Sequence, residues 1–96
     1  GSPTKLKSAR ICYRCYDAAD AIYWTGVRYQ GDSGSSDLLT SDLDHNKTNW
    51  ACYTLAASTP EQIQGSLLVR LNLNFDGTGE SHDIQIGKIT VTLTES

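Results

Sequence analysis

The chain has 96 residues and a formal net charge of −3, with 39% hydrophobic and 20% charged residues. This length suits one small domain, and the composition is that of a globular domain rather than a disordered segment. The negative charge argues against nucleic-acid binding through general electrostatics. No apolar run approaches the roughly 18–20 residues that span a bilayer. The opening Gly1-Ser2-Pro3 is typical of a cloning remnant, so we expect a remnant or linker at residues 1–4 and a single β-sandwich domain at residues 5–96. Because methionine is absent, we expect this domain to be part of a larger protein.

Hydrophobic and polar residues alternate over much of the chain, which is the period of β-strands. The alternation is cleanest over residues 67–75, and no segment keeps the 3.6-residue period of an amphipathic helix. We predict five long strands, at residues 5–16, 21–30, 50–56, 67–75 and 84–94. The expected fold class is all-β, an antiparallel sandwich or jelly roll with little or no helix.

The connections are predicted from turn residues and glycines. A turn at residues 17–20 would join the first two strands as a hairpin. Residues 31–49 are expected to form a long polar loop, with at most a brief strand or turn at Leu38-Leu39. Residues 58–61 suit a turn or one helical turn that ends at Gly65.

The last two predicted strands are joined by a turn at residues 76–79. Within the last strand the apolar positions change phase at Gly87-Lys88. A phase change at a glycine is how a β-bulge appears in a sequence, so we predict a bulge there.

The three cysteines are Cys12, Cys15 and Cys52, so at least one thiol stays free. Cys12 and Cys15 have the spacing of a redox or zinc motif, but residues three apart on a strand point to opposite faces. We therefore expect buried small hydrophobic residues rather than a shared metal ion. A bridge from Cys52 to either Cys12 or Cys15 is compatible with the spacing.

The second half of the chain resembles a known family. The residues that carry the resemblance are Trp50-x-x-Tyr53-Thr54, Leu67-x-Val69-Arg70-Leu71-x-Leu73 and Ile84-x-Ile86-x-x-Ile89-x-Val91-x-Leu93. Over about residues 50–94 they are similar to the closing half of galactose-binding-like β-sandwiches, the jelly-roll modules found among the carbohydrate-binding modules of glycoside hydrolases. Similar sandwiches occur near the C-termini of phage tailspikes and fibres. The resemblance implies an extracellular or virion-associated protein that binds a glycan or polysaccharide.

A sugar site needs aromatic faces for stacking and planar polar groups that hydrogen-bond hydroxyls. Even-numbered positions on three predicted strands supply both kinds of side chain, and they would share one face if those strands share one sheet. The predicted ligand-binding residues are Trp24, Arg28, Tyr16, Arg14, Arg70 and Asn72. Trp24 and Arg28 are the pair expected to contribute most, whereas Trp50 and Tyr53 are expected to be structural.

Oxygen-bearing side chains recur at alternating positions in Asp42-x-Asp44-x-Asn46, as they do in calcium-binding loops. Lys47 and Tyr53 stand where an EF-hand has its glycine and glutamate. Members of the family that this chain resembles often hold a structural calcium ion, so we name Asp42, Asp44 and Asn46 as candidate calcium ligands. The alternative is a solvated polar loop, and no other cofactor is expected.

No catalytic motif stands out, and we expect a protein that is not an enzyme. Three carboxylates, those of Glu61, Glu80 and Asp83, are expected in turns, where they would mainly add solubility. The first hypothesis is a non-catalytic carbohydrate-binding module appended to an enzyme or adhesin. The alternative is a structural C-terminal domain that trimerises and caps a phage tailspike or fibre. A third hypothesis is a five-stranded OB-like barrel, which the negative net charge disfavours.

Overall fold

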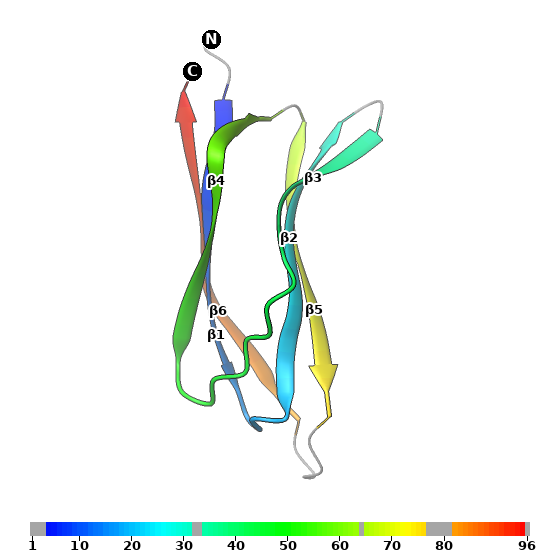
Figure 1. The fold of residues 1–96 in the computed structure, drawn as a ribbon, viewed down its shortest axis with the longest axis vertical. Helices are drawn as coiled ribbons and strands as arrows, with labels where there is room; N and C mark the ends of the chain where they lie inside the picture. Colours follow the sequence, from blue (N-terminus) through cyan, green and yellow to red (C-terminus); the bar gives the residue numbers. More distant parts are fainter. Residues whose placement is uncertain (1–3, 32–33, 64, 77–81, 96) are drawn as a thin grey trace.

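The computed structural model describes residues 4–31, 34–63, 65–76 and 82–95. These residues form an all-β fold of six strands instead of the predicted five (Figure 1). The strands are β1 (Thr4–Cys15), β2 (Asp20–Gly31), β3 (Gly34–Ser41), β4 (Ala51–Gln62), β5 (Ser66–Phe75) and β6 (Ile84–Glu95). No helix in the described ranges is long and apolar enough to cross a bilayer.

The strands form two antiparallel sheets of three strands each. Sheet A has the order β4-β1-β6, and sheet B has the order β3-β2-β5. The two sheets stand side by side in Figure 1, with sheet A on the left and sheet B on the right. The central strands are therefore β1 and β2, and the other four strands lie at edges.

The hairpin expected between the first two strands is wrong, because β1 and β2 belong to different sheets. The turn itself is present: Asp17 accepts hydrogen bonds from Ala19 N at 2.8 Å and from Asp20 N at 3.0 Å. It carries the chain from one sheet to the other. Each of the two strands already has strand partners on both sides, and each presents an apolar face to the opposite sheet.

The long polar loop expected at residues 31–49 is also wrong in part, because it contains β3. Its serines, aspartate and glycine have low strand propensity. The strand forms because β2 offers a free edge with which β3 pairs from Gly34 to Ser41, and because Leu39 is buried there. Tertiary pairing outweighs composition in this segment.

The helical turn expected at residues 58–61 is replaced by the end of β4. Pro60 is tolerated because β4 is an edge strand. It lies in an irregular stretch of the pairing between β1 and β4. Leu6 pairs with Glu61 and Ser8 pairs with Ala56, so one residue of β1 lies opposite four residues of β4. Gly65 follows with a φ of +90° and turns the chain toward β5.

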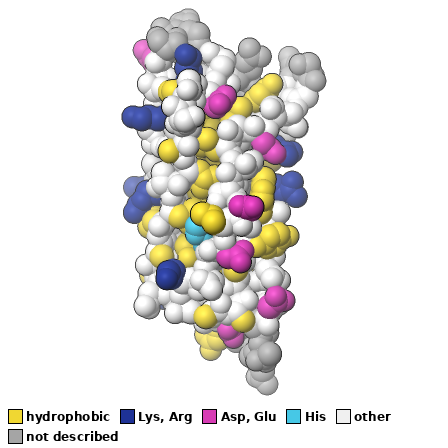
Figure 2. All heavy atoms as spheres, viewed as in Figure 1, with side chains coloured by type: hydrophobic (Ala, Val, Ile, Leu, Met, Phe, Trp, Pro, Cys, Tyr) yellow, Lys and Arg dark blue, Asp and Glu magenta, His cyan; other side chains and the backbone are white. Residues whose placement is uncertain are grey.

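The core lies between the two sheets and makes the arrangement sandwich-like. Its larger cluster combines residues of both sheets: Leu6, Ala9, Ile11 and Leu55 from sheet A with Val27 and Leu39 from sheet B. A smaller cluster contains Tyr13, Cys15 and Ile22. Hydrophobic side chains are visible along the middle of the molecule in Figure 2.

The bulge predicted at Gly87-Lys88 is confirmed. Ile11 pairs with Ile89 and Tyr13 pairs with Ile86, so the two residues Gly87 and Lys88 oppose the single residue Cys12. The extra residue brings the apolar positions before and after the bulge to the same face of β6. The turn expected at residues 76–79 lies outside the described residues except for Asp76.

Candidate functional site

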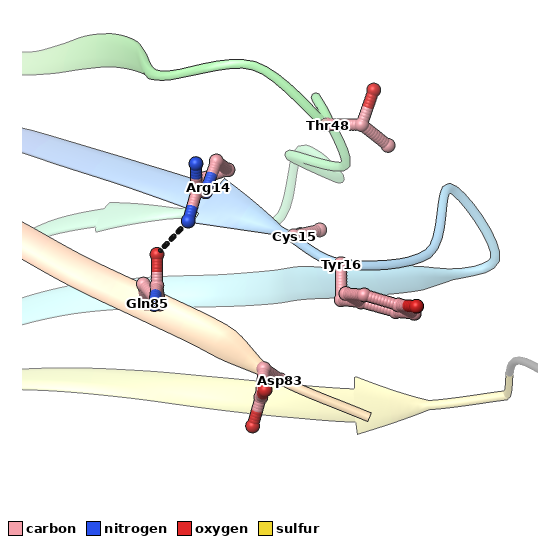
Figure 3. A pocket seen from close by; sticks show the side chains of 6 residues that line it. All are labelled: Arg14, Cys15, Tyr16, Thr48, Asp83 and Gln85. Carbon is pink, nitrogen blue, oxygen red and sulfur yellow. Dashed lines mark hydrogen bonds between the residues drawn. The ribbon is translucent and has the colours of Figure 1, made fainter. Parts of the chain in front are cut away.

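A cleft of about 290 Å³ lies where β1 ends and β6 begins (Figure 3). The residues that line it come from these two strands and from three connections, those between β1 and β2, β3 and β4, and β5 and β6: Arg14, Cys15, Tyr16, Thr48, Asp83 and Gln85. Arg14 Nη2 donates a hydrogen bond to Gln85 Oε1 at 2.5 Å, and Tyr16 is 66% exposed. The cleft thus combines an aromatic ring with a guanidinium, an amide, a carboxylate and a hydroxyl.

Trp50 lies next to this cleft, immediately before β4. The guanidinium carbon of Arg14 is 5.3 Å from the centre of the Trp50 ring, so Arg14 both lines the cleft and contacts the indole. The ring covers Gly87, where a Cβ would come within 2.9 Å of Trp50 Cζ3. Trp50 is nevertheless 55% exposed, so it is a surface residue of sheet A, and the structural role that we expected for it stays a prediction.

His45 attaches the connection before Trp50 to both sheets. Its main chain exchanges two hydrogen bonds of 2.9 Å with Ile22 of β2. Its imidazole stacks on the Tyr53 ring of β4, with ring centres 3.5 Å apart and planes 5° apart. Burial lowers the pKa of His45, and the nearby Asp44 carboxylate only partly offsets this effect. Tyr53 is half-buried in the core, as we expected.

Lys47 holds the same connection against β1. Its backbone N–H donates to the Tyr13 hydroxyl at 3.0 Å, and its carbonyl accepts from Cys15 N at 2.9 Å. These bonds place Thr48 at the cleft and leave Trp50 in position to cover Gly87. A segment far from β1 in sequence therefore supplies one wall of the site.

A second aromatic surface occupies the outer face of sheet B. The half-buried Trp24 ring covers Gly26, where any Cβ would overlap it. The guanidinium carbon of Arg70 lies 5.5 Å from the centre of this ring. Arg70 Nε also donates to Asn72 Oδ1 at 3.2 Å. The structure thus brings together three of the predicted ligand-binding residues, Trp24, Arg70 and Asn72.

The six predicted ligand-binding residues do not share one face. Arg14 and Tyr16 lie at the cleft of sheet A, whereas Trp24, Arg28, Arg70 and Asn72 belong to sheet B. The expectation required β1 and β2 to share a sheet, and they do not.

The expected pairing of Trp24 with Arg28 is also not present. Arg28 lies four residues farther along β2, about 13 Å at a rise of about 3.3 Å per residue. Its Nε binds Asp37 Oδ1 of β3 at 2.9 Å. Arg70, from the neighbouring strand, takes the place beside Trp24.

The cysteines separate as the strand geometry predicts. Cys12 forms a disulfide with Cys52 across β1 and β4, which decides between the two bridges left open. Cys15 is buried, and its thiol is free. Burial, with a smaller contribution from Asp20, raises the pKa of the Cys15 thiol, so it stays protonated near neutral pH.

The candidate calcium ligands lie in the connection between β3 and β4. Asp42 and Asp44 are exposed, and Asn46 Nδ2 donates to the Ala18 carbonyl at 3.2 Å. In the described part of the chain, no group of three or more His, Cys, Asp or Glu side chains is arranged to hold a metal ion. The calcium loop stays a prediction that a calcium titration followed by melting temperature would test.

Of the three carboxylates expected in turns, Glu61 lies in β4 and Asp83 lines the cleft. Glu80 lies outside the described residues. No family model, curated protein or solved structure matches this chain.

Proposed function

We propose that this chain is a non-catalytic carbohydrate-binding module with a jelly-roll β-sandwich of the galactose-binding-like kind, appended to an enzyme or adhesin. The observation that carries the proposal is the exposed Trp50 ring beside a polar cleft, with Arg14 in contact with both. Sites that bind small molecules commonly combine aromatic side chains with a small number of polar groups around a cleft, and this surface has both.

The arrangement suits a sugar because a pyranose ring has apolar C–H faces and a rim of hydroxyls. The C–H face would stack on Trp50, with Tyr16 as a second aromatic contact. The hydroxyls would bind the planar groups of Arg14 and Gln85 and the carboxylate of Asp83. Arg14 is already oriented by Gln85 and by the indole, so little side-chain entropy is lost on binding.

The proposal places the protein outside the cell or on a virion. The Cys12–Cys52 disulfide supports this placement, because disulfides persist in oxidising compartments and are rare in the cytosol. The expected partner is a glycan or polysaccharide, and neither a nucleic acid nor a membrane.

The test compares glycan binding by the parent protein and two tryptophan variants, first on a glycan array and then by titration calorimetry with the best glycan. Trp50→Ala should weaken binding about five- to thirtyfold, because stacking contributes on the order of 1–2 kcal/mol. The variant should stay folded with a melting temperature lowered by no more than several degrees, since the ring is 55% exposed and its removal costs one cation–π contact of about 0.5–1 kcal/mol.

Trp24→Ala is the matched control, because it removes the corresponding ring from the other sheet. It should leave binding at the cleft unchanged. If Trp24→Ala alone abolishes binding while the protein stays folded, the site lies on sheet B beside Arg70 and Asn72. If the parent protein binds no glycan on the array, the carbohydrate-binding function is wrong.

The alternative function is a structural, trimer-forming cap of a phage tailspike or fibre. It is favoured by the large hydrophobic side chains that the two edge strands β5 and β6 leave exposed. Solution mass separates the two functions: an appended module does not require self-association, whereas a fibre cap should be a stable trimer.

A further inference from the structure

The strands β5 and β6 each leave one edge of a sheet free. Among the strands that the structure describes, β6 pairs only with β1 and β5 pairs only with β2. Each therefore has one side on which backbone N–H and C=O groups have no strand partner. The two free edges belong to different sheets. In sheet A the free edge of β6 is on the side opposite β4, and in sheet B the free edge of β5 is on the side opposite β3.

The side chains of β6 that should face the core are partly exposed. Ile86 and Ile89 pair with the buried residues Tyr13 and Ile11, so they point toward the opposite sheet, yet they are 37% and 39% exposed. Leu93, opposite the buried Leu6, is 47% exposed. In a closed sandwich such inward positions would be covered.

The inward side chains of β5 behave in the same way. Leu73 pairs with the buried Ile22 and is 38% exposed, and Phe75 pairs with the buried Asp20 and is 47% exposed. We call the surface formed by the two free edges and by these inward residues the open side; its exposed members are Leu73, Phe75, Ile86, Ile89 and Leu93.

The disulfide indicates which groups of β6 point outward from its free edge. Cys12 and Cys52 have Cα atoms 4.0 Å apart, the short spacing of a non-hydrogen-bonded pair. The N–H and C=O of Cys12 are therefore directed toward β6. Backbone groups two residues apart in a strand point the same way, so those of Arg10 are also directed toward β6, where Arg10 pairs with Thr90. The N–H and C=O of Ile89 and Val91 consequently point away from β1, to the free edge.

We propose that the open side is the interface between two copies of this chain, related by a twofold axis normal to both sheets. One such axis pairs β6 antiparallel with the β6 of the second copy, and β5 antiparallel with its β5. Each layer becomes one continuous sheet, and the inward apolar residues of both copies meet across the axis. A single added peptide strand would complete only one of the two edges, whereas a second copy completes both.

The size of the open side fits this partner. The twelve residues of β6 extend about 40 Å at about 3.3 Å per residue. The two sheets of a sandwich lie about 10 Å apart, and the thickness of the strands makes the open side about 15–20 Å wide. The area of the open side is therefore roughly 600–800 Å² per copy. A stable interface of standard size buries about 800 Å² per partner.

The sequence of the free edge supports pairing as well. Proteins protect exposed edges with proline, lysine or bulges. The edge strand β4 contains Pro60 within its irregular stretch. In β6 the bulge and Lys88 precede Ile89, and the residues from Ile89 to Glu95 contain no proline, glycine or lysine.

The test measures mass by sedimentation equilibrium from about 1 to several hundred μM. The parent chain of 10.5 kDa should reach twice that mass. Ile89→Lys, which places an ammonium at the centre of the interface, should raise the dissociation constant more than tenfold. Thr92→Lys adds the same charge on the outer face of the same strand, where Thr92 is exposed, and should leave the dimer intact.

A monomer over the whole range, a trimer, or an Ile89→Lys protein that dimerises like the parent would overturn the proposal. Amide hydrogen exchange of the parent protein gives a second test that needs no substitution. The amides of Ile89 and Val91 should become more protected as concentration rises, while those along the free edge of β4 should not. Equal protection at all concentrations contradicts the twofold interface, even if Ile89→Lys does not fold.

Discussion

At the scale of residues, both outer sheet faces repeat one arrangement: a tryptophan ring covers a glycine and contacts an arginine. The two sets are Trp50, Gly87 and Arg14 in sheet A and Trp24, Gly26 and Arg70 in sheet B. Neither glycine is among the residues with positive φ, so these positions require space for the ring rather than a left-handed backbone. Each cation–π contact contributes about 0.5–1 kcal/mol at an exposed site.

Substitution of Gly87 tests this arrangement. A Cβ there would lie 2.9 Å from Trp50 Cζ3 and 3.5 Å from the Cys12 carbonyl oxygen. We expect Gly87→Val to lower the free energy of unfolding by about 1–3 kcal/mol, because the ring must move and the bulge must hold a β-branched side chain. Urea denaturation measures the loss.

The same substitution in a Trp50→Ala background separates the two causes. If displacement of the ring dominates, Gly87→Val should cost clearly less there. An identical loss in both backgrounds would assign the whole effect to the backbone of the bulge.

At the scale of elements, β5 has the clearest alternation in the chain, and the alternation separates its two faces. Leu71 is half-buried and packs against both core clusters. Leu68 pairs with Arg28 on the outer face of sheet B and is 47% exposed. Two leucines three residues apart in one strand therefore have opposite surroundings.

These two leucines give a matched pair of substitutions. Leu71→Ala should lower the free energy of unfolding by about 2–3 kcal/mol, since it leaves a gap where both clusters meet. Leu68→Ala should cost less than about 1 kcal/mol, because the side chain is already partly in water. Chemical denaturation of both variants measures the difference. Similar losses would mean that the outer face of sheet B is covered in solution.

At the scale of the whole molecule, the two sheets are joined differently on their two sides. On one side, the connection from β3 to β4 attaches to both sheets through His45 and Lys47. On the other side, β5 and β6 leave inward apolar residues exposed. The same connection supplies Thr48 and Trp50 to the candidate sugar site, so the integrity of that site depends on how the sheets are held together.

The stacked His45 should make this connection sensitive to acid. Burial lowers the pKa of His45 in the folded state, so the unfolded chain binds a proton more readily. The contribution of neutral His45 is fully present above the unfolded value of about 6.5 and is lost progressively as the pH falls below it. We expect the melting temperature to drop between about pH 7 and pH 5.

His45→Phe is the control, because it keeps a ring against Tyr53 and cannot be protonated. Its melting temperature should depend less on pH over the same interval than that of the parent protein. An unchanged pH dependence in the variant would show that other groups cause the acid sensitivity.

Much of the fold follows from local pattern. Alternation over residues 67–75 and 84–94 predicts β5 and β6, and the phase change at Gly87 predicts the bulge, because side-chain direction along a strand is a local property. β3 was missed because its serine-rich and aspartate-containing sequence has little strand propensity, and only the free edge of β2 makes it a strand. The continuation of β4 past Pro60 was missed for a related reason, since an edge position is not visible in the sequence.

The sequence by itself determined that the chain is all-β, which residues of its clearest strands face the core, and that Cys12 and Cys15 point to opposite faces. Only the tertiary structure decided which strands share a sheet. Hydrogen bonds between strands use the backbone, which is nearly the same at every residue, so sequence specifies the partner of a strand only weakly. For this reason the six predicted ligand residues divide between two sheets, and Trp50 lies at the surface because Gly87, distant in sequence, leaves room for its ring.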